Sequence, residues 1–235
     1  MIKHASIADL ISLLNVGFGF LAIFILLIDE SFVGSIRIHI AFSLILLALL
    51  ADGLDGIVAR KTKSGKLGDY IESMADMTSM SIAPLVFLYS VYHSDITSDA
   101  LFLIVVGGVF LFYLSSGVIR LASFHLMKQD QYFIGLPASA ATIILLVLAY
   151  LKIPLLAILG SVIILSFLLV SSIPFPKTDT RMNGIATILI FGAIVFSDMF
   201  SSFFLYLLLF SIVLYSLAGS IFIFTKKDSK HMKKT

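Results

Sequence analysis

The chain contains no cysteine among its 235 residues. This absence excludes disulfide bonds, thiolate metal ligands and a thiol nucleophile. Charged residues are scarce as well, at 13%, whereas 60% of the residues are hydrophobic and the mean hydropathy is +1.10. Such a composition excludes both an ordinary soluble domain and a disordered chain. The main solvent of this protein must therefore be lipid.

Long polar linkers, internal repeats and low-complexity segments are also missing. We therefore expect one helical membrane domain over residues 1–235, with a basic tail at 226–235. A membrane-spanning helix needs about 20 apolar residues. The sequence predicts an all-α, polytopic bundle of about eight transmembrane helices, in which the fifth and seventh are short. The eight apolar runs cover residues 7–28, 36–60, 68–93, 98–127, 136–151, 154–172, 182–197 and 200–225.

The distribution of basic residues predicts the orientation of this bundle, because Lys and Arg accumulate in cytoplasmic loops. With eight spans and both termini in the cytoplasm, 13 of the 16 Lys and Arg residues fall on the cytoplasmic side. Arg37 and Lys152 fall outside, and Arg120 lies within a span. The net charge of +2 comes from the cytoplasmic face and does not indicate a nucleic-acid partner.

Five acidic residues are concentrated between positions 52 and 76, although most of the predicted spans carry none. One carboxylate at the centre of a membrane helix costs about 2.5 to 3.5 kcal/mol, so a purely structural role does not explain the cluster. Helical spacing places these acids, together with small residues, on one stripe of each of two successive helices. The first stripe contains Asp52, Asp55, Gly56 and Ala59, and the second contains Gly68, Glu72 and Asp76.

The short loop between the two helices forces them to run antiparallel. Asp52 and Asp76 lie equally far from this loop, at about 12 Å along each helix, so we expect them to face each other. Asp55 and Glu72 should pair at a shallower level by the same argument. The sequence therefore predicts a square of four carboxylates near the cytoplasmic surface.

Four carboxylates without a thiol or a histidine suit hard divalent ions such as Mg²⁺, Mn²⁺ or Ca²⁺, and two such ions could be held. Gly56 and Gly68 expose the backbone beside the acids, which lets a bulky ligand approach closely. Arg60 offers a fork of donors to phosphate. The alternative for each glycine is close helix packing.

Two segments, DGLDGIVAR at 52–60 and GDYIESMAD at 68–76, resemble the signature of the CDP-alcohol phosphatidyltransferases. This signature consists of paired acids on each of two helices, with Gly and Ala-Arg at fixed spacing. The present chain departs from it in two ways. Glu72 stands where the family has Asp, and the gap between Arg60 and Gly68 is one residue shorter than expected.

Four further segments are similar to the phosphatidylserine synthase branch of that family. They are LISLLNVGFGFLAI at 10–23, SMSIAPLVFLY at 79–89, FIGLPASA at 133–140 and VSSIPFPK at 170–177. The stretch after Arg120 departs from this branch, because it has Ser123 and His125 where the branch usually has Arg and Asn.

The resemblance implies a six-helix family core and metal-dependent transfer of a lipid phosphoryl group from CDP-diacylglycerol or CDP-archaeol to L-serine, with release of CMP. It implies that Asp76 is the general base. Arg120 lies within a predicted span and needs an anionic partner there, for which the candidates are the acceptor carboxylate and a lipid phosphate. Asn15 would contact the nucleotide or form an interhelical hydrogen bond. The implied metal ligands are Asp52, Asp55, Glu72 and Asp76, and the implied nucleotide site contains Asn15, Asp55, Gly56, Ala59, Arg60 and Gly68.

Three alternatives stay open at this stage. The acceptor could be glycerol 3-phosphate or an inositol phosphate, with the same chemistry. A cation transporter would also place acids within the membrane, although transport sites generally lie at the midplane on broken helices. A noncatalytic assembly protein would explain the eight spans but not the facing stripes of acids. The sequence does not decide whether the chain forms a homodimer.

Overall fold

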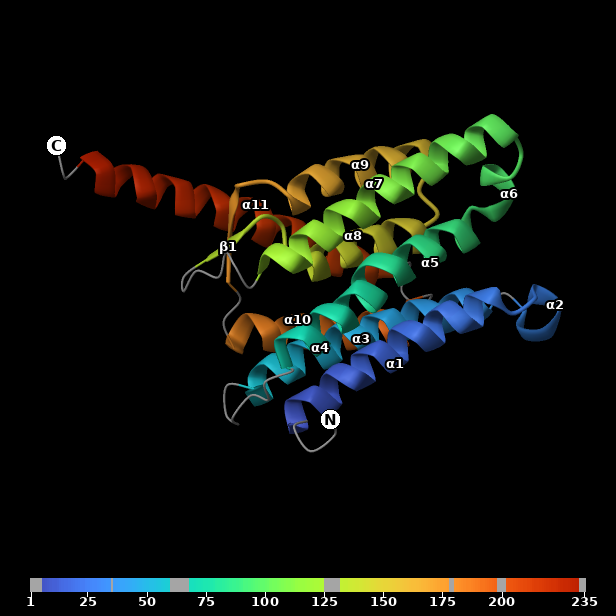
Figure 1. The fold of residues 1–235 in the computed structure, drawn as a ribbon, viewed down its shortest axis with the longest axis horizontal. Helices are drawn as coiled ribbons and strands as arrows, with labels where there is room; N and C mark the ends of the chain where they lie inside the picture. The colour runs from blue at the N-terminus through green and yellow to red at the C-terminus, as the bar shows by residue number, and fades with distance from the viewer. Residues whose placement is uncertain are drawn as a thin grey trace.

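The computed structural model describes residues 6–34, 36–59, 68–124, 132–177, 180–197 and 202–232. These residues form a bundle of roughly aligned helices, and α11 extends beyond the others (Figure 1). The prediction of an all-α polytopic membrane bundle is confirmed. The main helices are α1 (Ile7–Leu27), α3 (Ile36–Ala59), α4 (Gly68–Asp76), α5 (Ala83–Val91), α7 (Ala100–Phe124), α8 (Ala138–Tyr150), α9 (Leu155–Leu169), α10 (Thr180–Val195) and α11 (Phe203–Met232).

Helix length divides the bundle into two groups. Within the described residues, four helical stretches are long and apolar enough to cross a membrane on their own, at Ile7–Leu27, Ile36–Asp55, Gly68–Val91 and Ala100–Ser123. The helices α8, α9 and α10 are shorter, with 13, 15 and 16 residues. At a rise of 1.5 Å per residue, α8 is only about 20 Å long, less than the hydrocarbon thickness of about 30 Å. The shortness predicted for the run at 136–151 is therefore real, and α9 is short as well.

The third predicted span is not one uniform α-helix. A π-helical segment, η2 (Met77–Ile82), joins α4 to α5, and the N–H of Ala83 bonds to the carbonyl of Thr78, five residues earlier. Pro84 accounts for this irregularity, because it has no N–H and its ring crowds the carbonyl of Met80, four residues earlier. The hydroxyl of Thr142 on α8 donates to that carbonyl at 2.9 Å. A tertiary hydrogen bond thus partners the group that the proline leaves without its α-helical donor.

Small residues let the neighbouring helices approach η2 closely. A Cβ atom added to Gly19 on α1 would lie 3.0 Å from Cα of Ser79, and one added to Gly117 on α7 would lie 2.5 Å from Oγ of Ser81. Without a hydrophobic driving force between helices in lipid, such close backbone contact is a main source of helix association. The segment that follows Asp76 is therefore clamped between α1 and α7.

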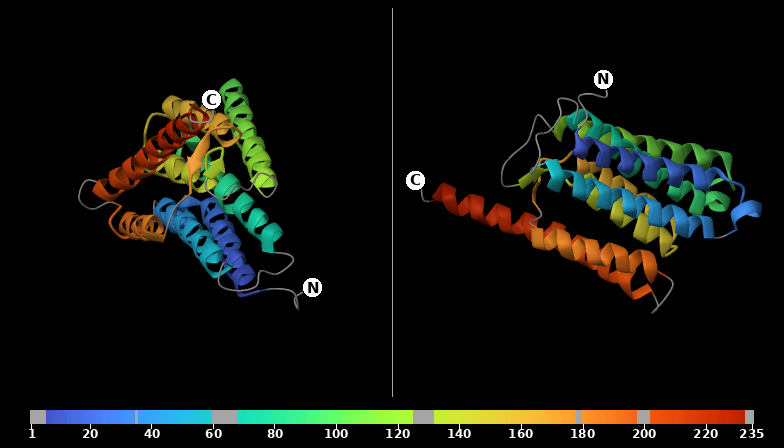
Figure 2. Two further views of the ribbon diagram at one scale, coloured as in Figure 1. Left: turned by 90° about the vertical axis from the view of Figure 1, so that its left-hand side faces the viewer. Right: turned by 90° about the horizontal axis from the view of Figure 1, so that it is seen from below.

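The fully buried core lies where α3, α5 and α8 meet, around Phe42, Phe87, Leu88, Leu145 and Leu146. The pair α10 and α11 adds a further layer, in which α10 contacts α3 and α11 contacts α8. Figure 2 shows these two helices along one side of the bundle. Large apolar side chains on the outer faces of α1, α7 and α9 stay exposed, as expected for surfaces in contact with lipid chains.

Two short strands were not predicted. They are β1 (Tyr132–Ile134) and β2 (Pro174–Pro176), which pair antiparallel with Phe133 opposite Phe175. Gly135 follows β1 at a φ of +79°, and an added Cβ would lie 2.5 Å from the carbonyl oxygen of Leu169. The chain turns there in a conformation that favours glycine. The segments 133–140 and 170–177, far apart in the sequence, therefore lie side by side.

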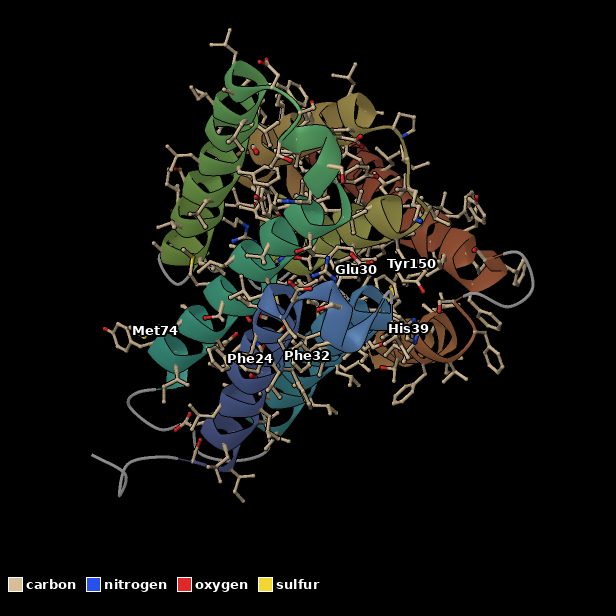
Figure 3. All side chains as sticks on the ribbon, turned by 90° about the vertical axis from the view of Figure 1, so that its right-hand side faces the viewer. Phe24, Glu30, Phe32, His39, Met74 and Tyr150 are labelled. Atoms are coloured by element: carbon tan, nitrogen blue, oxygen red, sulfur yellow. The ribbon has the colours of Figure 1, made fainter. Side chains whose placement is uncertain are left out.

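The two ends of the bundle differ. The start of α1, the start of α4 and the strands gather at one end, whereas α2 (Glu30–Val33) and α6 (His93–Ile96) lie at the other (Figure 1). At the α2 end, Nδ1 of His39 lies 3.0 Å from the hydroxyl of Tyr150 and 3.1 Å from Oγ of Ser197. Figure 3 shows His39 and Tyr150 where α3 meets α8. These polar contacts join α3, the end of α8 and the turn after α10, away from the acids.

The contact between α1 and η2 generates a prediction on stability. Gly19→Ala should destabilise the protein by about 1 to 3 kcal/mol, because the new methyl group meets the backbone of η2 rather than a flexible side chain. Gly17→Ala is the matched control on the same helix, since a Cβ there meets nothing within 4 Å. Thermal unfolding in detergent measures both. Equal unfolding temperatures for the two variants would contradict the proposed close packing.

Candidate functional site

Three carboxylates from two helices converge in the structure. Asp52 on α3 and Glu72 and Asp76 on α4 each place one oxygen so that these atoms all lie within 4.8 Å of one another. Steps of four residues on α4 bring Glu72 and Asp76 onto one face, and the antiparallel course of α3 brings Asp52 opposite them. The structure thus brings together three of the four acids that the sequence singled out.

Asp55, the fourth acid of the predicted square, lines the same cavity as these three, and its pairing with Glu72 stays a prediction. Asp55 is buried, at 3% exposure, and its Oδ2 accepts a hydrogen bond of 2.6 Å from the hydroxyl of Ser12 on α1. Sequence reasoning missed Ser12. A lone serine in an apolar run carries no signal, and its partner lies 43 residues away.

Asn15, one turn after Ser12, bonds to the second helix of the site. Its Nδ2 donates to Oδ1 of Asp76 at 3.0 Å, and the residue is completely buried. Of the two roles considered, the structure therefore contains the interhelical hydrogen bond. Asn15 is not among the residues that line the cavity described below, so a contact with a nucleotide stays a prediction. Within the described part of the chain, its Oδ1 is buried without a hydrogen-bond partner.

Gly68 begins α4 and packs against the first turn of α1. A Cβ there would lie 3.0 Å from Oδ1 of Asp9, so the close-packing role considered for this glycine applies. Asp9 and Ser6 form a reciprocal capping box at the start of α1, in which the N–H of Ser6 donates to Asp9 at 2.7 Å. The spacing of Ser6 and Asp9 ahead of an apolar run is a signal that could have revealed this cap from the sequence.

The remaining predicted residues are placed as follows. Arg120 on α7 is buried, at 8% exposure, and its Nε donates to the carbonyl of Leu136 at 3.1 Å. This bond fixes one edge of the guanidinium group next to the turn that follows β1. Gly56 and Ala59 lie on the last turns of α3, but their surroundings fall outside the described residues, as does Arg60 altogether.

A cavity of about 640 Å³ contains the acids and the arginine. Asp52, Asp55, Glu72, Asp76 and Arg120 all line it, and most of the remaining wall is apolar. Such a volume accommodates a ligand of substantial size. The sequence did not single out the other polar lining residues, which are Ser73, Ser139, Asn183, Thr187 and Tyr215.

The strands close one side of this cavity. Phe133 of β1 and Pro176 of β2 both contribute to the lining. The hydroxyl of Tyr215 on α11 donates to the carbonyl of Pro176 at 2.7 Å, and the ammonium group of Lys177 lies 5.3 Å from the ring centre of Phe133. The two strands therefore connect α11 to the wall that carries Arg120.

The chemistry of the three-acid group follows from its ligand atoms. All of them are carboxylate oxygens, which are the ligands that Mg²⁺, Mn²⁺ and Ca²⁺ prefer. Three such charges within 4.8 Å repel one another strongly in a medium of low dielectric constant. The arrangement therefore requires a cation or shared protons, and its donor set fits a divalent cation.

Comparisons with known proteins agree with this chemistry. A sequence model of the family described as CDP-alcohol phosphatidyltransferase matches residues 5–214. A CDP-diacylglycerol–serine O-phosphatidyltransferase of Methanocaldococcus jannaschii is 32% identical over 188 residues, which cover 77% of this chain and 78% of that protein. An archaetidylserine synthase of Methanothermobacter thermautotrophicus is 32% identical over 184 residues, or 74% of this chain and 71% of that protein.

A bacterial relative extends this set. The CDP-diacylglycerol–serine O-phosphatidyltransferase of Helicobacter pylori strain J99 is 31% identical over 192 residues, which cover 74% of this chain and 78% of that protein. Archaeal and bacterial relatives thus align over similar shares of the chain.

The crowding of the carboxylates generates a second prediction. In the presence of EDTA, Asp52→Asn should raise the free energy of unfolding by an amount on the order of 1 kcal/mol, because it removes one of three mutually repelling charges. Asp95→Asn, at an exposed position in α6, is the control and should change little. Thermal unfolding measures both variants. A less stable Asp52→Asn protein under these conditions would show that the three charges do not strain the metal-free fold.

Proposed function

Because the chain belongs to the CDP-alcohol phosphatidyltransferase family, we propose that it transfers a phosphatidyl or archaetidyl group from a CDP-lipid to L-serine and releases CMP, in phospholipid biosynthesis. The observation that carries the proposal is the convergence of Asp52, Glu72 and Asp76 on a cavity that also contains a buried arginine. The choice of serine is supported by the names of relatives at about 32% identity.

We propose that Asp52, Glu72 and Asp76 hold a divalent cation, with Asp55 beside them as a further ligand. Mg²⁺ or Mn²⁺ would suit these oxygen donors, Ca²⁺ would also fit, and two ions would match the four carboxylates. When bound, the cation supplies positive charge that offsets the charge on the pyrophosphate of the donor and on the departing CMP. Glu72 keeps the carboxylate of the family pattern with one additional methylene.

In this proposal, Asp76 is the general base. Its carboxylate takes the proton of the serine hydroxyl, whose oxygen then attacks the phosphorus that bears the lipid. A new bond forms between the serine oxygen and that phosphorus, and the bond to the bridging oxygen breaks. CMP leaves with the electron pair. The nucleotide part of the donor would lie near Gly56, Ala59, Arg60 and Gly68, at the adjoining ends of α3 and α4.

We assign Arg120 to the acceptor. Its guanidinium group lines the same cavity as the acids, and a carboxylate is a bidentate match for such a group. Serine carries a carboxylate in addition to its hydroxyl, so Arg120 would orient the hydroxyl toward Asp76. A phosphate of the donor lipid is the other anion that this residue could bind.

The protein is an integral membrane protein, and we propose that both termini and the site face the cytoplasm. The excess of Lys and Arg in the predicted cytoplasmic loops and tail of the sequence supports this orientation. The start of α1, the start of α4 and the far end of α11 lie at one end of the bundle (Figure 1). CDP-diacylglycerol or CDP-archaeol could then keep its chains in the bilayer while its nucleotide enters from the aqueous side.

The test of this function is CMP release by purified protein supplied with CDP-lipid and a panel of alcohols. L-Serine should support release, and glycerol 3-phosphate and inositol phosphate should not. Release with one of the phosphorylated alcohols but not with serine would overturn the acceptor assignment and keep the reaction class. Release with none of them, from folded protein with divalent metal present, would overturn the enzyme assignment.

The assignment of Asp76 generates a prediction on turnover. Asp76→Asn should lower the rate of CMP release by at least about 10²-fold, because it removes both the base and a charged ligand without changing the volume. Size-exclusion chromatography in detergent checks that the variant is folded. A rate above about a tenth of the wild-type value would refute the role of Asp76.

The unusual acid generates a separate prediction. If Glu72 is a working ligand, Glu72→Gln should be inactive, whereas Glu72→Asp should keep substantial activity and change the preferred metal. The comparison is made by measuring CMP release with Mg²⁺, Mn²⁺ and Ca²⁺ in turn. Wild-type activity in Glu72→Gln would show that Glu72 is not a metal ligand in this protein.

Arg120 yields a prediction on substrate affinity. Arg120→Lys should raise the KM for serine by about tenfold or more, since a lysine cannot reproduce the bidentate contact. The KM for the CDP-lipid should change little. The reverse pattern, with a weakened donor and unchanged serine, would move Arg120 to the donor lipid.

A further inference from the structure

The buried face of α1 carries polar residues only at the end of the bundle where the acids lie. Asp9, Ser12 and Asn15 are buried there, and Gly19, Ala22 and Leu26 continue the same face toward the opposite end. Polar side chains in membrane helices often serve as interhelical hydrogen bonds. Here, however, the bonds of Ser12 and Asn15 both end on carboxylates that line the cavity, one on α3 and one on α4.

The bond from Ser12 is short and enclosed. The distance of 2.6 Å between its Oγ and Oδ2 of Asp55 is typical of a hydroxyl that donates to an ionised carboxylate. Both residues are 3% exposed. The same hydroxyl lies 3.3 Å from the carbonyl of Ala8, but it has one proton, and the shorter contact takes most of it. Oδ2 of Asp55 is therefore directed toward α1.

Asn15 holds the second carboxylate in a comparable way. Its amide donates to Oδ1 of Asp76 from a completely buried position, three residues after Ser12 on the same helix. The rise along α1 between these residues is about 4.5 Å. A single rigid element thus fixes one oxygen of Asp55 and one of Asp76 relative to each other. This leaves the ligand set dependent on a helix that contributes no ligand itself.

We propose that Ser12 and Asn15 are positioning residues, which orient the carboxylates of Asp55 and Asp76 for the divalent cation. This inference rests on the function proposed above and adds to it a second layer of residues on α1. Loss of such outer hydrogen bonds typically weakens metal affinity 10- to 100-fold while the charge of the site stays the same. A role confined to helix packing would change stability and leave metal affinity unaltered.

The test is Mn²⁺ binding by the purified, substrate-free chain, with free Mn²⁺ followed by electron paramagnetic resonance. Ser12→Ala should raise the Kd for Mn²⁺ by about tenfold or more, and Ser12→Thr, which keeps the hydroxyl, should bind as the wild type does. Asn15→Leu removes the amide at similar volume and should also weaken binding. Ser166→Ala is the matched control, because Ser166 is fully buried and its hydroxyl bonds to the carbonyl of Val162 on its own helix.

The possible results distinguish the positioning role of Ser12 and Asn15 from the existence of the metal site. Wild-type affinity in both Ser12→Ala and Asn15→Leu would overturn the positioning role while the metal site stands. An equal loss in Ser12→Ala and Ser12→Thr would assign the effect to packing and would also overturn it. If the wild-type chain itself failed to bind Mn²⁺, the proposed metal site would fall, and the inference would fall with it.

Discussion

Asp52, Glu72 and Asp76 repel one another, and the helices around them must hold the three carboxylates together against that repulsion. Their oxygens lie within 4.8 Å of one another, and each carboxylate costs free energy in a membrane helix. The fold must hold these groups together until a cation offsets the repulsion. It does so with helices rather than loops, since α3 and α4 carry all three acids and α1 packs along both.

The irregular helix after Asp76 also helps to hold the acids in place. A step of four residues places Glu72 and Asp76 on one face of α4. The π-helical turn of η2 then changes which residues face the neighbouring helices. Ser79 and Ser81 consequently meet Gly19 and Gly117 on either side. Pro84 explains why the turn forms at this place, and the hydroxyl of Thr142 satisfies the carbonyl of Met80. The acids are thereby mounted on a segment that two neighbouring helices hold in place.

Spacing within the sequence predicted the part of the site that helical periodicity controls. The antiparallel pair of helices and the facing of Asp52 and Asp76 follow from residue intervals and one short loop. Periodicity could not predict the partners of those acids, because Ser12 and Asp55 are 43 residues apart and Asn15 and Asp76 are 61 apart. The hydrogen bond that directs Asp55 toward α1 comes from that distant serine.

The pairing of the two strands could not be predicted from the sequence either. The segments 133–140 and 170–177 stood out in the sequence, but nothing in either one indicates that Phe133 pairs with Phe175. The all-α class and the positions of the apolar helices were predictable, because a hydrophobic run of sufficient length has few alternatives in lipid. Local features such as η2 and the turn at Gly135 depend on neighbours that only the folded chain brings together.

We propose that α3 and α4 form a metal centre for transfer of a lipid phosphoryl group. Anomalous X-ray diffraction at the manganese edge, from crystals of active protein grown with Mn²⁺, would locate the ion. We expect anomalous density in contact with the carboxylates of Asp52, Glu72 and Asp76. Density elsewhere in the protein, or none at these acids in protein that requires Mn²⁺ for CMP release, would contradict it.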